Sequence, residues 1–264
     1  MLKPDYRKIL FSVMALDLFL ALVLYVAFQG LEADSFASRT LYANELLYTT
    51  VYAFTFALML VIAMASLRGY SRSGVRMARF MGLALLAYAV SILLAMHYPA
   101  ISAGSVVMRL AGFTVAAIYL GVGALAPGED RMKPKDHASL ITLSIFTVVV
   151  LMAFSFVVSR FPAVADLVLT AGVDGVVGYS TFTRGYILIL ALAALFSLSK
   201  LSTIYIATKN MPVVYFVSGI LVIILAALFY SLSDPWRPFW WIGIGMESLS
   251  AIMFIFGVLY AFLE

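Results

Sequence analysis

Four ionisable side chains lie inside long apolar runs of this sequence, and they are Asp17, Arg109, Lys200 and Glu247. A charge at the centre of a bilayer costs about 2.5–3.5 kcal/mol on insertion scales. Such residues therefore usually face the interior of a helix bundle, pair with one another or line a wet cavity, where they bind ions, relay protons or recognise ligands.

Asp17 and Lys200 are expected at similar depths in the membrane. At about 1.5 Å per helical residue, Asp17 lies roughly 12 Å and Lys200 roughly 10 Å from the same membrane face. The two could form a buried ion pair. Two alternatives stay open, because the carboxylate could accept a hydrogen bond from Ser197 or Ser199, and a long lysine side chain can reach the headgroups.

Arg109 and Glu247 belong to the opposite half of the membrane. Glu45, His97 and Arg184 are expected at the rim on the same side, so we predict a polar ligand pocket formed by all five residues. The alternative is a structural pair between Arg109 and Glu247 that joins two helices.

The last apolar run presents one face of small and polar residues. Gly243, Glu247, Ser250 and Gly257 follow helical spacing. Small residues on one face allow helices to pack closely in a membrane. We therefore predict that this face, with Glu247, points into the protein.

The elements that must position these residues are membrane-spanning helices. The 264-residue chain is 64% hydrophobic and 11% charged, whereas soluble domains carry about 25% charged residues. Apolar runs of about twenty residues match the thickness of a bilayer. Eight spans are predicted, at 9–29, 46–67, 79–98, 105–126, 139–159, 185–207, 212–232 and 239–263. We expect an all-α polytopic membrane protein, a single eight-helix domain, with the first span retained rather than cleaved as a signal peptide.

The basic residues between the spans indicate the orientation. Eleven fall on one side, and they are Lys3, Arg7, Lys8, Arg68, Arg72, Arg76, Arg79, Arg131, Lys133, Lys135 and Lys209. Four fall on the other, and they are Arg39, Arg160, Arg184 and Arg237. Because cytoplasmic loops are enriched in Lys and Arg, we predict that both termini are cytoplasmic, as an even number of spans requires. The same loops account for the net charge of +4 without a nucleic-acid partner.

The longest loop on the outer side runs from residue 160 to residue 184. Its first part is expected to form a short helix at the interface. Its second part contains Gly172, Gly175 and Gly178, so we expect irregular structure there. Loops of this length often serve as lids or binding loops.

Motifs for catalysis, metals and cofactors are missing from the sequence. There is no cysteine, and His97 and His137 are expected on opposite sides of the membrane, so they cannot jointly hold a haem. No phosphate-binding loop or nucleophile motif occurs. We predict no metal site, no cofactor and no catalytic residues, and an enzyme is the least favoured function.

Two segments in the second half carry a resemblance to a known family. They are FVVSRFPAVADLVLTAGVDG followed by FTRGYILILALAALFSLSK, and FVSGILVIILAALFYSLSDPW followed by FWWIGIGMESLSAIMFIFGVLY. This pattern resembles the eight-helix membrane-associated sensor domains that precede histidine kinases and diguanylate cyclases. The second and eighth spans lack histidine, so no site residue of that family transfers to this chain. The resemblance implies a sensor input domain, either truncated or signalling by contact with a partner.

The favoured hypothesis is a sensor or ligand-binding module in the cell membrane. It would bind a hydrophobic or amphiphilic molecule, or an ion, within the bundle. Expected partners are the bilayer, a cytoplasmic signalling protein or membrane subunit, and a second copy of the chain. The alternatives are a transporter or channel and an accessory subunit. The spans lack the central prolines typical of broken transporter helices, which argues against transport.

Overall fold

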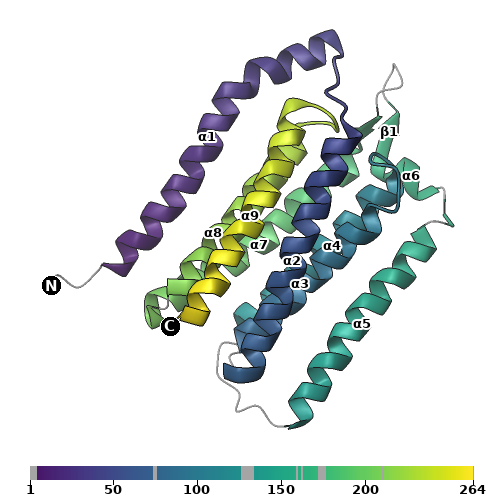
Figure 1. The fold of residues 1–264 in the computed structure, drawn as a ribbon. Helices are drawn as coiled ribbons and strands as arrows, with labels where there is room; N and C mark the ends of the chain where they lie inside the picture. Colours follow the sequence, from purple (N-terminus) through teal and green to yellow (C-terminus); the bar gives the residue numbers. More distant parts are fainter. Residues whose placement is uncertain are drawn as a thin grey trace. The chain divides into compact units, whose positions relative to one another are not determined.

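The structure of the protein is a computed structural model that describes residues 5–73, 76–125, 134–158, 160–161, 163–171, 177–209 and 211–263. Its elements run in the order α1 (Tyr6–Ser38), α2 (Glu45–Ser73), α3 (Arg76–Ala95), α4 (Ala103–Leu125), α5 (Pro134–Val158), α6 (Ala163–Val168), β1 (Leu169–Ala171), β2 (Val177–Tyr179), α7 (Thr181–Thr208), α8 (Met211–Leu232) and α9 (Pro238–Leu263) (Figure 1). Among the residues that support the predicted orientation and the glycine-rich loop, Lys3, Arg131, Lys133, Gly172 and Gly175 lie outside the described residues.

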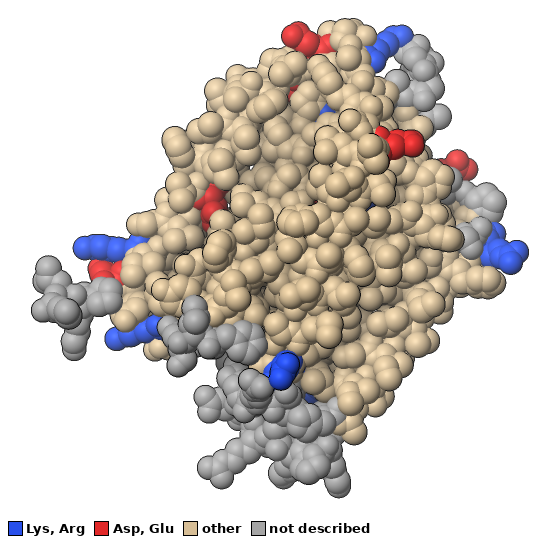
Figure 2. All heavy atoms as spheres, in the orientation of Figure 1, with Lys and Arg blue, Asp and Glu red and all other residues tan. Residues whose placement is uncertain are grey.

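Eight helices in the described ranges are long and apolar enough to cross a membrane. They are α1 to α5 and α7 to α9, and each coincides with one of the eight predicted spans. Figure 2 shows that the face in view carries few charged side chains. Large apolar side chains such as Phe11 and Phe19 are more than 60% exposed. An all-α, multi-pass membrane architecture follows from this pattern.

The first helix is longer than the sequence predicts. It continues from the expected end at residue 29 to Ser38, and it stops where Arg39 adopts a left-handed backbone with φ of 57°. A left-handed residue is a common way to end a helix. The extension carries Glu32 and Ser35, which are both buried. Tertiary contacts therefore bury polar residues that lie beyond the predicted end of the first span.

Two compact units make up the chain. Unit 1 comprises residues 1–44 and 187–264, and unit 2 comprises residues 45–186. The helix α7 begins in unit 2 and continues into unit 1. Each unit has its own core and is described by itself below.

In unit 1, α8 and α9 form a tightly packed antiparallel pair. Gly219 lies against the ring of Phe254, and Gly243 lies against the ring of Tyr230. A side chain at either glycine would collide with these rings. Gly243, Glu247, Ser250 and Gly257 are all buried, which confirms the predicted inward face of α9.

The helix α1 runs parallel to α8 in the same unit. Asp17 contacts Ser218 near the start of α8, and Glu32 contacts Ser233 just beyond its end. The ring of Tyr6, at the start of α1, also packs against the ring of Tyr205. Because α9 runs antiparallel to α8, α1 begins at the end of unit 1 where α9 finishes (Figure 1).

In unit 2, α3 packs between α2 and α4 and also contacts α5. Gly112 of α4 lies directly against the side chain of Ser91 on α3. Ser91 is itself fully buried and donates a hydrogen bond to the carbonyl of Tyr88 at 2.7 Å. Small residues thus bring α3 and α4 close together, as is typical of membrane helices.

The loop between α5 and α7 contains more regular structure than predicted. The expected short helix is confirmed as α6. The glycine-rich part includes β2, in which Gly178 pairs with Thr170 of β1 in an antiparallel register. This segment is anchored to the first turn of α7, because Thr183 donates a hydrogen bond to the carbonyl of Val168 at 2.8 Å.

Candidate ligand pocket

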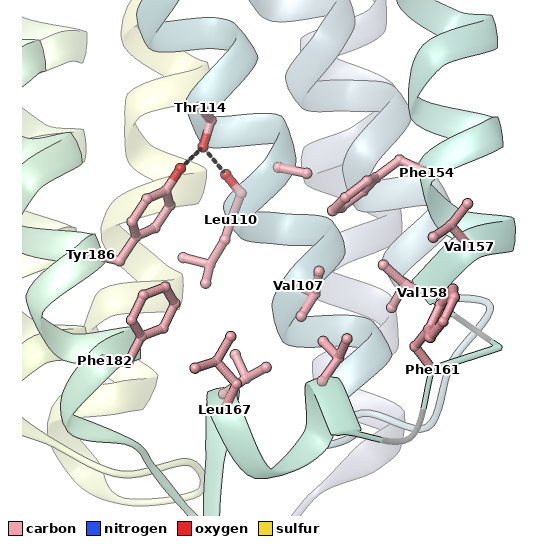
Figure 3. A pocket seen from close by; sticks show the side chains of 13 residues that line it. Val107, Leu110, Thr114, Phe154, Val157, Val158, Phe161, Leu167, Phe182 and Tyr186 are labelled. Atoms are coloured by element: carbon pink, nitrogen blue, oxygen red, sulfur yellow. Dashed lines mark hydrogen bonds between the residues drawn. The ribbon is translucent and has the colours of Figure 1, made fainter.

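An apolar pocket of about 320 Å³ lies within unit 2. Its lining residues are Val107, Leu110, Ala111, Thr114, Phe154, Val157, Val158, Phe161, Val164, Leu167, Val168, Phe182 and Tyr186 (Figure 3). They come from α4, the end of α5, α6 and the first turns of α7. A volume of this size falls within the range of small-molecule sites, which are mostly apolar with few polar groups.

Helical periodicity explains the contribution of α4 to the pocket. Val107, Leu110, Ala111 and Thr114 follow steps of three, one and three residues, so they share one face of the helix. The helix α6 forms another part of the wall, and its end is fixed to the start of α7 through Ser180, the residue before α7. The hydroxyl of Ser180 donates a hydrogen bond to the carbonyl of Leu167 at 2.6 Å. The loop between α5 and α7 therefore forms part of the wall of this pocket in unit 2.

The pocket contains one pair of hydroxyl groups. The Oγ1 atom of Thr114 lies 2.8 Å from the hydroxyl oxygen of Tyr186. The same Oγ1 donates a hydrogen bond to the carbonyl of Leu110 at 2.7 Å (Figure 3). Among the residues that the structure describes, no Asp, Glu, Lys, Arg or His lines this pocket. Its chemistry therefore suits an uncharged, mainly apolar molecule.

The five residues predicted to form an outer polar pocket have different environments. Glu45 and His97 are exposed, and Arg184 is half-buried with its Nε donating to the carbonyl of Tyr179 at 3.4 Å. Arg109 is buried, and its guanidinium lies 4.9 Å from the ring centre of Tyr52. None of these residues lines the apolar pocket.

Glu247 is buried in unit 1, as predicted. It is 1% exposed and accepts a hydrogen bond from the hydroxyl of Tyr230 at 2.6 Å. The other four predicted residues belong to unit 2. A shared polar pocket, or a structural pair between Arg109 and Glu247, remains a prediction.

The structure does not bring Asp17 and Lys200 together. Asp17 is buried and accepts a hydrogen bond from the hydroxyl of Ser218 at 2.7 Å. Lys200 is exposed, with its ammonium 5.7 Å from the ring centre of Phe196. The predicted ion pair is therefore wrong, because equal depth in the membrane does not place two side chains on facing helix surfaces. Of the alternatives, a serine hydroxyl does meet the carboxylate, but it belongs to α8 rather than α7.

No protein family, curated protein or solved structure matches this chain. The resemblance to membrane-associated sensor domains therefore remains a prediction.

Unit 1 contains a polar cluster around Glu32 and Arg237 that the sequence did not predict. The carboxylate of Glu32 accepts hydrogen bonds from the hydroxyl of Ser233 at 2.6 Å and from the backbone N–H of Phe239 at 2.8 Å. A carboxylate at the first turn of α9 satisfies an amide that has no partner within the helix. Beside it, Arg237 is 5% exposed, donates to Ser35 at 3.1 Å and lies 3.7 Å from the ring centre of Phe36.

The three tryptophans lie next to this cluster and pack against one another. The ring centres of Trp236, Trp240 and Trp241 lie between 5.0 and 5.7 Å apart. Tyr42 joins the end of α1 to them, since its N–H donates to the carbonyl of Trp236 and its carbonyl accepts from the indole of Trp241. The aromatic group thus fixes the segment after α1 to the turn between α8 and α9.

Neither missed feature had a strong signal in the sequence. Glu32 lies beyond the predicted end of the first span, and Arg237 counted only as a basic residue between two spans. The residues that line the apolar pocket could equally have faced lipid.

Within the described ranges, no group of three His, Asp or Glu side chains is arranged to hold a metal ion.

Proposed function

We propose that this chain is an integral membrane sensor or ligand-binding module that binds a small hydrophobic or amphiphilic molecule within its helices. The observation that supports this function is the apolar pocket of unit 2 with its single pair of hydroxyl groups. The pocket is an open hollow of about 320 Å³, which is large enough to admit part of a small apolar molecule.

The pocket is accessible to a molecule dissolved in the bilayer. Phe161 and Phe182 border it, and their side chains are 58% and 52% exposed. An apolar ligand is concentrated by the membrane, so it can reach the pocket without crossing water. The charge bias of the loops favours cytoplasmic termini, and this orientation would put the pocket in the outer half of the membrane.

The helix α7 supplies a route for a signal. It carries Phe182 and Tyr186 at the pocket and continues without a break to Thr208. Near its other end, the ring of Tyr205 packs against the ring of Tyr6. A ligand that shifts the first turns of α7 would act on the start of α1, where a cytoplasmic or membrane partner could respond. Such coupling requires that the ligand favour one of two arrangements of this helix.

Photolabelling tests the proposed function. The purified protein in nanodiscs is incubated with a long-chain alcohol carrying a diazirine in its alkyl chain, irradiated and digested, and the labelled peptides are identified by mass spectrometry. We expect saturable labelling of residues in α4, α5 and α6 that line the pocket. Unsaturable labelling spread evenly over the lipid-facing helices would contradict a binding pocket.

A pair of variants sharpens this test. Ala111→Phe places a ring in the pocket and should abolish saturable labelling. Ala193→Phe makes the same change at an exposed position of α7 outside the pocket and should leave the labelling unchanged. Equal loss in both variants would indicate a general defect in folding.

Ion transport is the second candidate function, and the buried carboxylates of unit 1 favour it. Asp17 and Glu32 are each 5% exposed, and the described residues supply neither with an ion-pair partner. Intramembrane carboxylates often mark ion or proton pathways. Proteoliposomes loaded with a pH-sensitive dye distinguish the two functions, because transport predicts a proton or cation flux that Asp17→Asn abolishes.

A further inference from the structure

We infer that the unit 2 pocket selects an uncharged lipid with a hydroxyl head group over the same chain ending in a carbonyl or a carboxylate. This inference rests on the proposed function and names the chemical class of its ligand. The observations that carry it are the hydrogen-bond directions at Thr114 and Tyr186 and the absence of charge in the pocket lining.

The hydrogens of both hydroxyl groups are already used. A threonine hydroxyl has one hydrogen, and Thr114 donates it to the carbonyl of Leu110 at 2.7 Å. The contact of 2.8 Å between Thr114 and Tyr186 must then use the phenolic hydrogen of Tyr186. Only lone pairs on the two oxygens remain for a ligand. The ligand must therefore donate the hydrogen bond, which a hydroxyl group can do and a ketone or ester carbonyl cannot.

The lining explains why the head group must be uncharged. A carboxylate would leave water for a pocket whose side chains, apart from Thr114 and Tyr186, are aliphatic or phenylalanine. Burying a charge without a partner is far more costly than burying a hydroxyl that forms one hydrogen bond. A cationic head group would meet the same penalty, since no carboxylate of the described part of the chain lines the pocket.

The volume of the pocket limits how much of the ligand fits inside it. A volume of about 320 Å³ lies at the lower end of the range of small-molecule sites, so the pocket holds the head group of a lipid and only the first part of its chain. A longer alkyl or isoprenoid chain would therefore extend past the exposed rings of Phe161 and Phe182 into the bilayer. This arrangement suits a single-chain lipid alcohol whose hydroxyl reaches Tyr186.

Competition against the diazirine probe tests the selectivity in the wild-type protein. The competitors are 1-hexadecanol, 2-hexadecanone and hexadecanoic acid at a pH where the acid is ionised, each corrected for its partition into the nanodisc. We expect the alcohol to displace the probe at about five-fold lower concentration than the ketone, the factor that corresponds to one net hydrogen bond. The ionised acid should be the weakest competitor.

Two variants make the hydrogen-bond directions testable. Tyr186→Phe removes one of the two acceptors and leaves only the Oγ1 atom of Thr114, so the advantage of the alcohol over the ketone should fall. Thr114→Val removes the acceptor for the phenolic hydrogen, so Tyr186 is then free to donate and the preference should shift towards the ketone. A merely structural role for these residues predicts neither change in selectivity.

The chain provides a matched control for both variants. Outside the pocket, Tyr119 contacts Thr147, which donates to the carbonyl of Leu143 at 2.8 Å, so the same arrangement of hydroxyl groups is repeated. Tyr119→Phe and Thr147→Val should leave the selectivity at its wild-type value. A change equal to that in the pocket variants would overturn the inference.

Failure of the inference is distinguishable from failure of the proposed function. Equal displacement by alcohol and ketone in the wild-type protein would overturn the selectivity while saturable labelling of the pocket still supported ligand binding. Absence of saturable labelling would overturn both. Because the comparison of competitors requires no substitution, a variant that fails to fold does not remove the test.

Discussion

The carboxylate of Asp17 in α1 accepts a hydrogen bond from the hydroxyl of Ser218 in α8, 201 positions later in the chain. Glu32 and Ser233 are separated by the same 201 positions and form the second such contact. The two helices therefore remain in register over fifteen residues. This parallel register holds α1 against α8 through hydroxyl–carboxylate hydrogen bonds instead of salt bridges.

We expect energetic coupling between Asp17 and Ser218 but not between Asp17 and Lys200. Asp17→Ala and Ser218→Ala should show a coupling energy of about 1 kcal/mol, because each removes one partner of the buried hydrogen bond. Asp17→Asn and Lys200→Met should be additive within about 0.5 kcal/mol, because the residues do not touch. Thermal unfolding of the single and double variants measures both cycles. An energetic coupling between Asp17 and Lys200 would support the ion pair and contradict the structure.

Loss of the Glu32 carboxylate should loosen the junction between α1 and the turn before α9. Glu32→Ala leaves the buried N–H of Phe239 and the hydroxyl of Ser233 without this acceptor, at a cost of about 1–3 kcal/mol. All three tryptophans of the chain lie at this turn, so their fluorescence during unfolding reports on it. Glu45→Ala, at an exposed carboxylate, should change stability by less than about 0.5 kcal/mol.

Two glycines of α4 should respond in opposite directions to the same substitution. Gly112→Ala should destabilise unit 2 by about 1–3 kcal/mol, since the new Cβ collides with the buried side chain of Ser91. Gly121→Ala meets no atom within 4 Å and should be neutral or stabilising by up to about 1 kcal/mol. Unfolding in a mild detergent provides the comparison, and similar losses in both variants would contradict the close packing of α3 against α4.

Single cysteines can test the proposed orientation, because the natural chain contains none. Lys8 and Lys209 are both exposed, and the ammonium of Lys209 lies 5.7 Å from the ring centre of Tyr6 at the start of α1. Lys8→Cys and Lys209→Cys should react with a membrane-impermeant maleimide only from the cytoplasmic side. His97→Cys, at an exposed position after α3, should react only from the other side. If two of the three variants reacted from the side opposite to the one expected, the predicted cytoplasmic position of the termini would be contradicted.

The sequence by itself determined the number of spans and one buried face. A run of about twenty apolar residues is long enough to cross a bilayer as a helix. Lipid offers no hydrogen-bond partner for backbone N–H and C=O groups, and a helix pairs these groups within the run itself. Glycine and serine at helical spacing around Glu247 likewise identified the inward face of α9, since small residues favour close packing of helices.

Tertiary structure alone decided which residues meet. Depth follows from counting residues along a helix, but rotation about its axis and the choice of neighbour do not, so the partner of Asp17 is Ser218 and not Lys200. Glu32 and Arg237 became buried only because α1 extends to Ser38 and packs at the start of α9. The pocket escaped detection because in a membrane protein both lipid and core favour apolar side chains, so the pattern of apolar residues does not show which of them enclose a cavity.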